Sequence, residues 1–328
     1  MPAAGEPAAR RQWVLRLLLG LALFWIAFHD VDLRAVGRTF ALSRPVWLAA
    51  ACASVFVTVG LVVARWHLLL HPASKTRHLP VLMAAVIASQ VANIVMPFRL
   101  GDAVRIGAVS RALGLPPAEI LGSVAIERLL DALSVALTAA LLRFAGALPA
   151  SARAGMAALA AAAAAAVLLV VGFRMLHGRL ERLGSGLSRP FPPRVRHWLS
   201  AQVGLIVRGF RRASAGGAAA RAFMASCGVM AGSILTTWLV MRAFDLPTPA
   251  LSAAVLVIVL QIGTVVVPVP GAVGISQVLT VQTLKLWGVD EATGLAYAVM
   301  LYLVSRAPKL AVLPIALAAL TPKGAETA

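Results

Sequence analysis

Charged residues are scarce in this sequence: they make up 13% of its 328 residues, against about 25% in an average soluble protein. Acidic residues are especially few, with 12 Asp and Glu against 30 Lys and Arg, while 60% of the chain is hydrophobic. A soluble protein of this composition would expose far larger apolar patches than monomers tolerate. The shortage of charge therefore excludes an ordinary soluble enzyme and a disordered chain, and it indicates a polytopic membrane protein.

Aromatic residues and cysteines are few as well. Aromatics make up 6% of the chain, and most basic residues lie in short stretches between apolar runs. Nucleic-acid binders instead place basic and aromatic side chains together on a water-facing surface, so we expect no nucleic-acid partner. The cysteines Cys52 and Cys227 lie inside apolar runs, without the spacing of a metal or redox site. We therefore expect no metal and no cofactor.

Common enzyme motifs are absent from the sequence: it contains no Walker A, H-E-x-x-H or G-x-S-x-G pattern. We expect no catalytic residues and no enzyme activity. An intramembrane lipid transferase or phosphatase that uses Glu127 and Asp131 stays open as an alternative.

Long apolar runs, by contrast, are abundant, and a run of about 20 apolar residues is long enough for a transmembrane helix. Six runs are predicted to span the membrane: residues 13–28, 46–70, 118–142, 154–173, 222–244 and 293–320. The segment 174–221 differs, because it holds ten arginines and a single acid, Glu181. Its charge predicts a cytoplasmic segment that contacts the lipid surface.

Two further apolar segments are interrupted by proline and glycine. Residues 79–111 break around Pro97 and Gly101, and residues 251–287 break in a loop that contains Pro268, Pro270, Gly271 and Gly274. The residues before each break can be aligned, Gln90 to Pro97 with Gln261 to Pro268. We predict that each interrupted segment forms a re-entrant hairpin. Interrupted segments at corresponding positions in the two halves of a transporter indicate its binding site. The alternative is that every half-segment spans fully, which gives up to ten short helices.

The positive-inside rule assigns the ends of these segments to one side of the membrane or the other. With six spans and two hairpins that enter from opposite faces, every basic cluster lies on the cytoplasmic side. This predicts an all-α membrane protein with inverted-topology repeats in the cytoplasmic (inner) membrane and both termini cytoplasmic. Residues 1–320 would form one transmembrane domain, with repeat one at about 46–142, repeat two at about 222–320, and a short tail at 321–328.

Ionisable residues within apolar segments are the candidate site, because they are costly in a membrane and usually face a cavity or one another. Arg99, Asp102 and Arg105 lie at the first break, near the start of a predicted helix. Two guanidinium groups and free backbone N–H donors suit the anionic headgroup of a lipid. In the alternative, Asp102 caps the helix and the arginines extend to the membrane surface.

Two other groups are also candidates for headgroup binding. Glu127, Arg128 and Asp131 share a predicted helix, with the two acids four residues apart on one face. They either face the same cavity as the hairpin or form an internal ion-pair network. Arg306 lies in the last helix with Tyr302 on the same face; in the alternative, Arg306 and Lys309 mark the inner membrane boundary.

The motifs together resemble the lysylphosphatidylglycerol synthase transmembrane-region family, whose members are flippase-like membrane proteins and include a hopanoid-associated branch. The resemblance rests on Pro97-Phe-Arg-Leu-Gly-Asp-Ala-Val-Arg105, Gly122-Ser-Val-Ala-Ile-Glu-Arg-Leu-Leu-Asp131, Pro268-x-Pro-Gly-Ala-Val-Gly-Ile-Ser-Gln277 and Tyr302-x-x-x-Arg306. Three residues depart from the family pattern: Asp102 and Gln277 stand for Glu, and Ala272 for Gly. No aminoacyl-transfer domain follows in the sequence, so the resemblance implies lipid movement and not lysine transfer.

We therefore expect a flippase or transporter that moves a lipid between leaflets by alternating access. The lipid would be an anionic phospholipid, an isoprenoid-linked lipid or a hopanoid-type lipid. Membrane lipids are the expected partners, with a homo-oligomer or a lipid-biosynthesis enzyme as further candidates. The runner-up is a membrane scaffold for a lipid- or glycan-modifying enzyme, in which substitutions in residues 174–221 would matter most.

Overall fold

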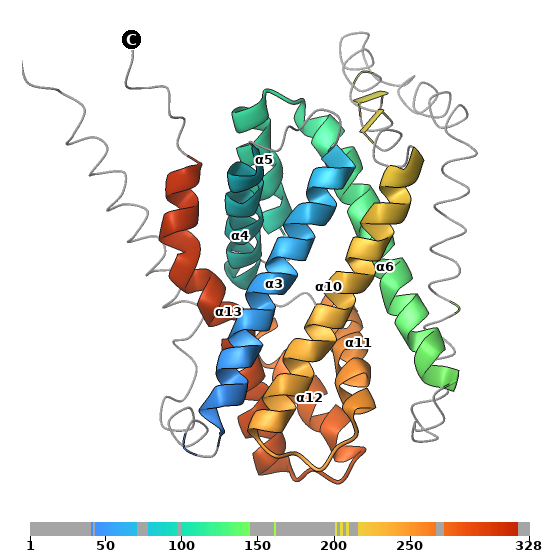
Figure 1. Cartoon of the computed structure of the whole chain (residues 1–328), viewed down its shortest axis with the longest axis vertical. Coiled ribbons are helices and arrows are strands. Elements are labelled where there is room, and N and C mark those ends of the chain that lie inside the picture. The colour runs from blue at the N-terminus through green and yellow to red at the C-terminus, as the bar shows by residue number, and fades with distance from the viewer. Residues whose placement is uncertain are drawn as a thin grey trace, which may run out of the picture. The chain divides into compact units, whose positions relative to one another are not determined.

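The computed structural model describes five stretches of the chain, and every regular element in them is an α-helix, as the sequence predicts (Figure 1). The stretches are residues 43–70, 78–96, 100–144, 216–266 and 272–320, with single residues or pairs at 41, 161, 201, 204–205 and 208–209. The predicted spans at 13–28 and 154–173 and most of the basic segment lie outside the described residues.

Three described helices are long and apolar enough to cross a membrane: α3 (Pro45–Leu70), α10 (Gly216–Ala243) and α13 (Glu291–Ala319). At 1.5 Å per residue, the 26 residues of α3 extend about 39 Å, more than the ~30 Å of a hydrocarbon core. These helices coincide with three of the predicted spans. The fourth long helix, α6 (Pro117–Phe144), covers the predicted span at 118–142 but carries charged residues in its middle. The total of six spans stays a prediction.

The two interrupted segments fold as pairs of shorter helices. The first pair is α4 (Leu79–Val95) and α5 (Gly101–Leu113), and the second is α11 (Ala250–Val266) and α12 (Ile275–Lys285). In the second pair α11 packs against α12, and α12 packs against α13. The proline and glycine breaks therefore end and restart helices where the sequence predicts.

The chain divides into two compact units. The first unit comprises Met1–Gly60, Pro80–Ala108 and Ala231–Ala328, and the second comprises Leu61–Leu79 and Val109–Met230. The backbone passes between the units within α3, at the first residue of α4, and within α5 and α10, and almost all of both interrupted segments belongs to the first unit. The predicted division into two sequential repeats stays a prediction.

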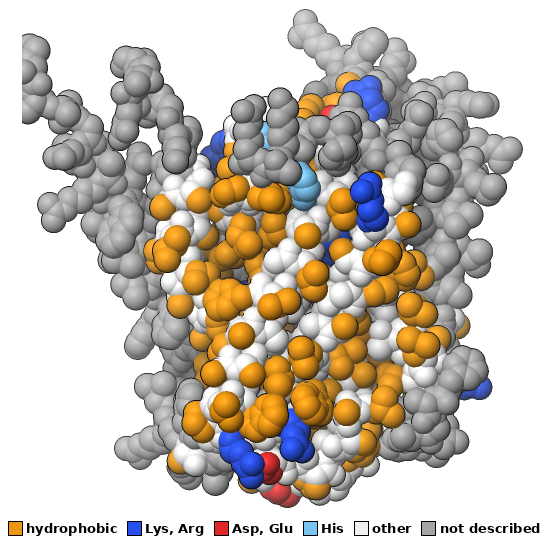
Figure 2. Space-filling model, viewed as in Figure 1, with side chains coloured by type: hydrophobic (Ala, Val, Ile, Leu, Met, Phe, Trp, Pro, Cys, Tyr) orange, Lys and Arg blue, Asp and Glu red, His pale blue; other side chains and the backbone are white. Residues whose placement is uncertain are grey.

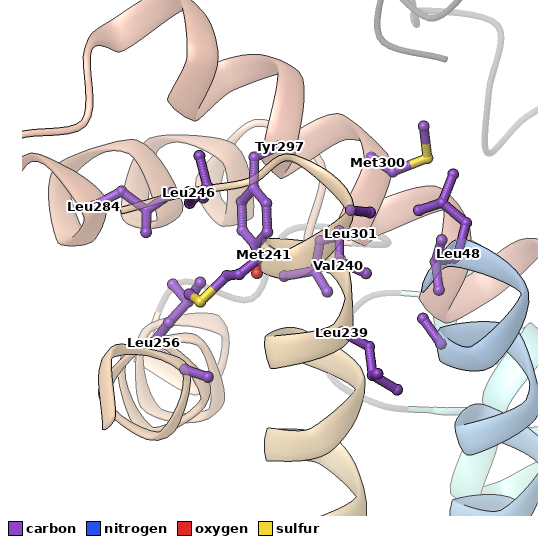
Figure 3. Close-up of a cluster of buried hydrophobic side chains, with 14 of the residues drawn as sticks. Leu48, Leu239, Val240, Met241, Leu246, Leu256, Leu284, Tyr297, Met300 and Leu301 are labelled. Atoms are coloured by element: carbon purple, nitrogen blue, oxygen red, sulfur yellow. The ribbon is translucent and has the colours of Figure 1, made fainter. Parts of the chain in front are cut away.

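The core of the first unit joins α10, α11, α12 and α13 with the start of α3 (Figure 3). Tyr297 is fully buried in this cluster, where its hydroxyl donates a 2.9 Å hydrogen bond to the carbonyl oxygen of Thr237. The ring of Phe244 meets the ring of Tyr297 edge to face, with 6.0 Å between centroids. A buried phenol whose hydroxyl is hydrogen-bonded fixes α13 against α10 without leaving a polar atom unsatisfied.

Small and hydroxyl-bearing residues bring α3 and α10 together. In the first unit, a Cβ atom at Gly232 would overlap the hydroxyl of Thr58, and the hydroxyls of Ser54 and Thr236 are hydrogen-bonded over 2.7 Å. Lipid chains are as apolar as leucine, so membrane helices associate through such close packing and interhelical hydrogen bonds.

The outward faces of the same helices are apolar. Val57 of α3 is 64% exposed and Met224 of α10 is 72% exposed. Figure 2 shows hydrophobic side chains over both helices, with Lys, Arg, Asp and Glu side chains near the helix ends. At one such end, Arg44 forms a 2.6 Å ion pair with Asp245, and both side chains are exposed. This distribution is typical of helices that face lipid and end at its surface.

Candidate functional site

Among the described residues, the most extensive charged cluster is in the second unit and centres on Arg65 of α3. Its Nη2 donates a 2.8 Å hydrogen bond to Oε1 of Glu127, and its Nη1 forms an ion pair with Asp131. Nη1 also donates a 3.0 Å hydrogen bond to the hydroxyl of Ser226 on α10. Arg128 completes the cluster through a 3.2 Å ion pair with Asp131. We call these five residues the Arg65 network.

The local sequence explains how α6 supplies its share of the network. Glu127 and Asp131 are four residues apart and therefore lie on one helix face, as the sequence predicts. Arg128 is three residues before Asp131 and reaches it along the helix surface. One turn earlier on α6, the hydroxyl of Ser123 accepts a 3.3 Å hydrogen bond from the indole of Trp66 on α3. The two helices are thus joined by polar contacts over successive turns.

Electrostatically, the Arg65 network is balanced. It contains two arginines and two carboxylates, so its formal charge is zero. The side chains of Arg65 and Glu127 are only 2% and 3% exposed, whereas those of Arg128 and Asp131 are partly exposed. A buried ion pair is retained only where each charge has partners of this kind, because desolvation of a lone charge is expensive. Of the two readings of Glu127, Arg128 and Asp131, this arrangement favours the internal ion-pair network.

Sequence reasoning missed Arg65. It is the only Arg or Lys in the 26 residues of α3, within an otherwise apolar run. The rule that singled out Glu127, that an ionisable residue inside a span needs a partner or a cavity, applies equally to Arg65. This rule was sufficient to identify Arg65 as a candidate, although it could not identify the residues that Arg65 pairs with.

The second cluster lies where α4 ends and α5 begins, in the first unit. The backbone N–H of Gly101 donates a 2.8 Å hydrogen bond to the side-chain oxygen of Asn93. A Cβ atom at Gly101 would overlap both that oxygen and the carbonyl oxygen of Ser89. The Ser89 hydroxyl in turn donates a 3.4 Å hydrogen bond to Oδ1 of Asp102. Glycine is thus required here because α4 lies directly against the first turn of α5.

Arg105 is the most deeply buried charge of this second cluster, with 2% of the residue exposed. Its Nη2 lies 3.3 Å from Oδ1 of Asp102, one turn earlier in α5. The structure therefore brings together two of the three predicted residues at the first break. Pro97 and Arg99 lie outside the described residues.

The second break is described only in part. Gly274 stands immediately before α12 with a φ of 78°, which glycine adopts without strain. Pro268, Pro270 and Gly271 lie outside the described residues.

Arg306 is the remaining predicted site residue, in the middle of α13. Its guanidinium carbon is 3.7 Å from the ring centroid of Tyr302, one turn earlier. Its Nη1 donates a 3.0 Å hydrogen bond to the hydroxyl of Ser305. The predicted pairing of Tyr302 with Arg306 on one face is therefore observed as a cation–π contact.

In the part of the chain that the structure describes, no group of three or more His, Cys, Asp or Glu side chains is arranged to hold a metal ion. The polar groups in the two clusters and at Arg306 are arginines, carboxylates, hydroxyls and the amide of Asn93. Such groups are suited to ion pairing, to binding oxyanions and to hydrogen bonding.

Comparison with known proteins decides the family. The model of the family described as "Lysylphosphatidylglycerol synthase TM region" matches residues 13–312, which is most of the chain. The protein belongs to this family. No curated protein matches the chain, and no solved structure matches it.

Membership in the lysylphosphatidylglycerol synthase transmembrane-region family confirms the resemblance seen in the motifs. The matched range includes the Arg65 network, the start of α5 and Arg306. With the three long apolar helices, it establishes a membrane protein with a lipid-related function.

Proposed function

We propose that this protein is a flippase that moves a lipid between the two leaflets by alternating access. The observation that carries the proposal is that apolar helices of this protein contain ion-paired arginines, and that its family is associated with membrane lipids. Intramembrane charges of this kind mark substrate pathways in transport proteins. The proposed substrate is an anionic phospholipid, an isoprenoid-linked lipid or a hopanoid-type lipid.

Helix length supports the re-entrant form of both interrupted segments. The 11 residues of α12 extend about 16 Å and the 13 residues of α5 about 20 Å, whereas the hydrocarbon core is ~30 Å thick. Neither helix is long enough to cross alone, which disfavours the alternative of up to ten full spans. Breaks at membrane depth are tolerated where protein or a water-filled cavity surrounds them.

Arg99 and Arg105 are the proposed headgroup residues at the first hairpin. The ion pair with Asp102 and the contacts among Ser89, Asn93 and Gly101 hold the first turn of α5 in place. The N-terminus of a helix favours an anion, and arginine provides two parallel donors for a phosphate.

For Glu127, Arg128 and Asp131 we propose an indirect role. Their charges are balanced by Arg65, so the network sets the position of α3, α6 and the first half of α10. The same pairing disfavours a transferase or phosphatase in which Glu127 acts as a general base, because Oε1 of Glu127 is already hydrogen-bonded to Arg65 and the side chain is almost completely buried. We accordingly propose transport without catalysis.

The orientation proposed is multi-pass in the inner membrane, with both termini in the cytoplasm. The start of α10 lies in the last part of the arginine-rich segment 174–221, whereas the ion pair of Arg44 and Asp245 lies just beyond its other end. The positive-inside rule then places the start of α10 on the cytoplasmic side. A homo-oligomer or a lipid-biosynthesis enzyme remains a proposed partner.

A translocation assay in proteoliposomes tests the function. Wild-type protein should move a fluorescent phosphatidylglycerol between leaflets faster than protein-free vesicles do. Arg99→Ala and Arg105→Ala should abolish this activity while the protein still elutes as a single species with unchanged helix content. Arg44→Ala, which removes an exposed arginine, should leave the rate unchanged. Wild-type rates in both site variants would refute the site, and no transport by the wild type would refute the flippase.

A further inference from the structure

Asp131 connects the two arginines of the Arg65 network. Its Oδ1 pairs with Nη1 of Arg65, and its Oδ2 lies 3.2 Å from Nη1 of Arg128. Asp131 is 14 residues from the start of α6 at Pro117 and 13 from its end at Phe144, which is about 20 Å of helix in either direction. Carboxylates at such depth in membrane helices mark proton relays and ion pathways in transport proteins.

Exposure distinguishes the two carboxylates of the network. The side chain of Asp131 is 28% exposed and that of Arg128 is 36% exposed, whereas the side chain of Glu127 is sealed at 3%. Charged side chains at membrane depth face protein or water rather than lipid. A proton from water therefore reaches Asp131 and not Glu127.

The buried half of the network does not depend on Asp131 alone. Nη1 of Arg65 also donates a 3.0 Å hydrogen bond to the hydroxyl of Ser226, and Nη2 donates its 2.8 Å hydrogen bond to Glu127. When Asp131 is neutralised, Arg65 therefore keeps one carboxylate and one hydroxyl. The positive charge that is left over belongs to Arg128, which is partly exposed. The network thus has a second charge state that leaves no buried charge without a partner.

The groups around Asp131 come from three helices. In the part of the chain that the structure describes, its ion-pair partners are Arg65 and Arg128, while Glu127 and Ser226 contact the same arginine, Arg65. The other ionisable side chains that these helices carry in the second unit are on other faces of α3 and α10, or 12 residues and about 18 Å away along α6. They are His67, Arg221 and Cys227 in the first case, and Glu119 and Arg143 in the second.

We propose that Oδ2 of Asp131 binds a proton in competition with Arg128, and that lipid transport is linked to this protonation. The proton neutralises Asp131 and ends its ion pair with Arg128, and release of the proton to water restores the pair. A proton that binds more strongly in one conformation shifts the protein toward that conformation. The inference rests on the proposed lipid transport and adds the proton as its coupling ion.

Infrared difference spectroscopy of the full-length protein in detergent tests proton binding directly. The wild type should gain the carbonyl band of a protonated carboxyl group as the pH is lowered, and Asp131→Asn should lack part of this band. Arg128→Gln removes the competing guanidinium, so the same part should appear at higher pH. An identical band in the wild type and Asp131→Asn overturns the site.

The matched control is Asp245→Asn, which removes a carboxylate from the exposed pair with Arg44. In the Asp245→Asn background, Arg128→Gln should still move the carboxyl band, whereas in the Asp131→Asn background it should not. Because Arg128 is partly exposed, Arg128→Gln also keeps the test valid where Asp131→Asn does not fold. A band that does not move in Arg128→Gln refutes the competition.

The pH profile of the proteoliposome assay tests the link to transport. Translocation by the wild type should vary with pH, Asp131→Asn should make its rate nearly independent of pH, and Arg128→Gln should move the midpoint of the profile to higher pH. A purely structural role of Asp131 would instead lower the rate by the same factor at every pH, and that result overturns the proposal.

Failure of the proton site is distinguishable from failure of the proposed function. A carboxyl band that depends on Asp131, in a protein that moves no lipid, would keep the proton site and reject the flippase. Translocation with the wild-type pH profile in Asp131→Asn would keep the flippase and reject the link to protons.

Discussion

Nη2 of Arg65 on α3 lies 2.8 Å from Oε1 of Glu127 on α6, and both side chains are almost completely buried. Among the described ion pairs this is the one in which both partners are inaccessible. Burial of such a pair contributes little net stability compared with apolar residues of the same volume, because desolvation offsets the attraction. Its consequence is specificity: only one arrangement of the two helices satisfies both charges.

Removal of Arg65 alone should therefore be severe. Arg65→Met leaves Glu127 without its buried partner, and we expect a loss of about 3–5 kcal/mol in unfolding free energy. Arg65→Met combined with Glu127→Met removes one charge of each sign and should recover most of that loss. Thermal melting of the purified variants in one detergent measures both effects.

The exposed pair of Arg44 and Asp245 provides the control for this experiment. Arg44→Met should cost no more than about 1 kcal/mol, the usual worth of a surface ion pair. Equal losses in Arg65→Met and the double variant would show that the volume of the arginine matters and its charge does not.

Gly101 is predicted to tolerate no side chain. Gly101→Ala places a Cβ atom against the carbonyl of Ser89 and the amide of Asn93, so α4 and α5 must separate. We expect a loss of about 1–3 kcal/mol, as for other overpacked sites. In Gly60→Ala the new methyl meets nothing within 4 Å, and higher helix propensity should stabilise the protein by about 0.5–1 kcal/mol. Melting curves that shift in the same direction for both variants would contradict this prediction.

The sequence was sufficient to predict the helices that the structure describes and the positions of both breaks, because apolar run length and proline determine them locally. It also placed Glu127 and Asp131 on one face, since that depends only on helical periodicity. The partner of Glu127 could not be predicted, because Arg65 is 62 residues away and no local rule states which helix packs on α6. The requirement for glycine at position 101 could not be predicted either, because it depends on how closely α4 approaches the first turn of α5.

The contact between α3 and α10 leads to a further prediction. A methyl group at Gly232 would overlap the hydroxyl of Thr58, so Gly232→Ala should separate the helices locally and lower the melting temperature. Gly228→Ala is the control, because its nearest neighbour is a terminal methyl of Leu61 at 3.3 Å, which can rotate away. The difference in melting temperature between the two variants is the measurement. A larger loss in Gly228→Ala would be the contrary result.

Asp290 gives the first turn of α13 a dependence on pH. Its carboxylate accepts a 2.9 Å hydrogen bond from the backbone N–H of Thr293, and this bond lowers the pKa of Asp290 below its ordinary value of 3.8. A carboxyl whose pKa is lowered by folding stabilises the protein above its ordinary pKa, and that contribution disappears as the pH falls through the lowered value. Asp290→Asn keeps an N-cap acceptor without titrating. The melting temperature of the wild type should therefore exceed that of Asp290→Asn at pH 7 by more than it does near pH 3, and a constant difference would show that the cap does not depend on ionisation.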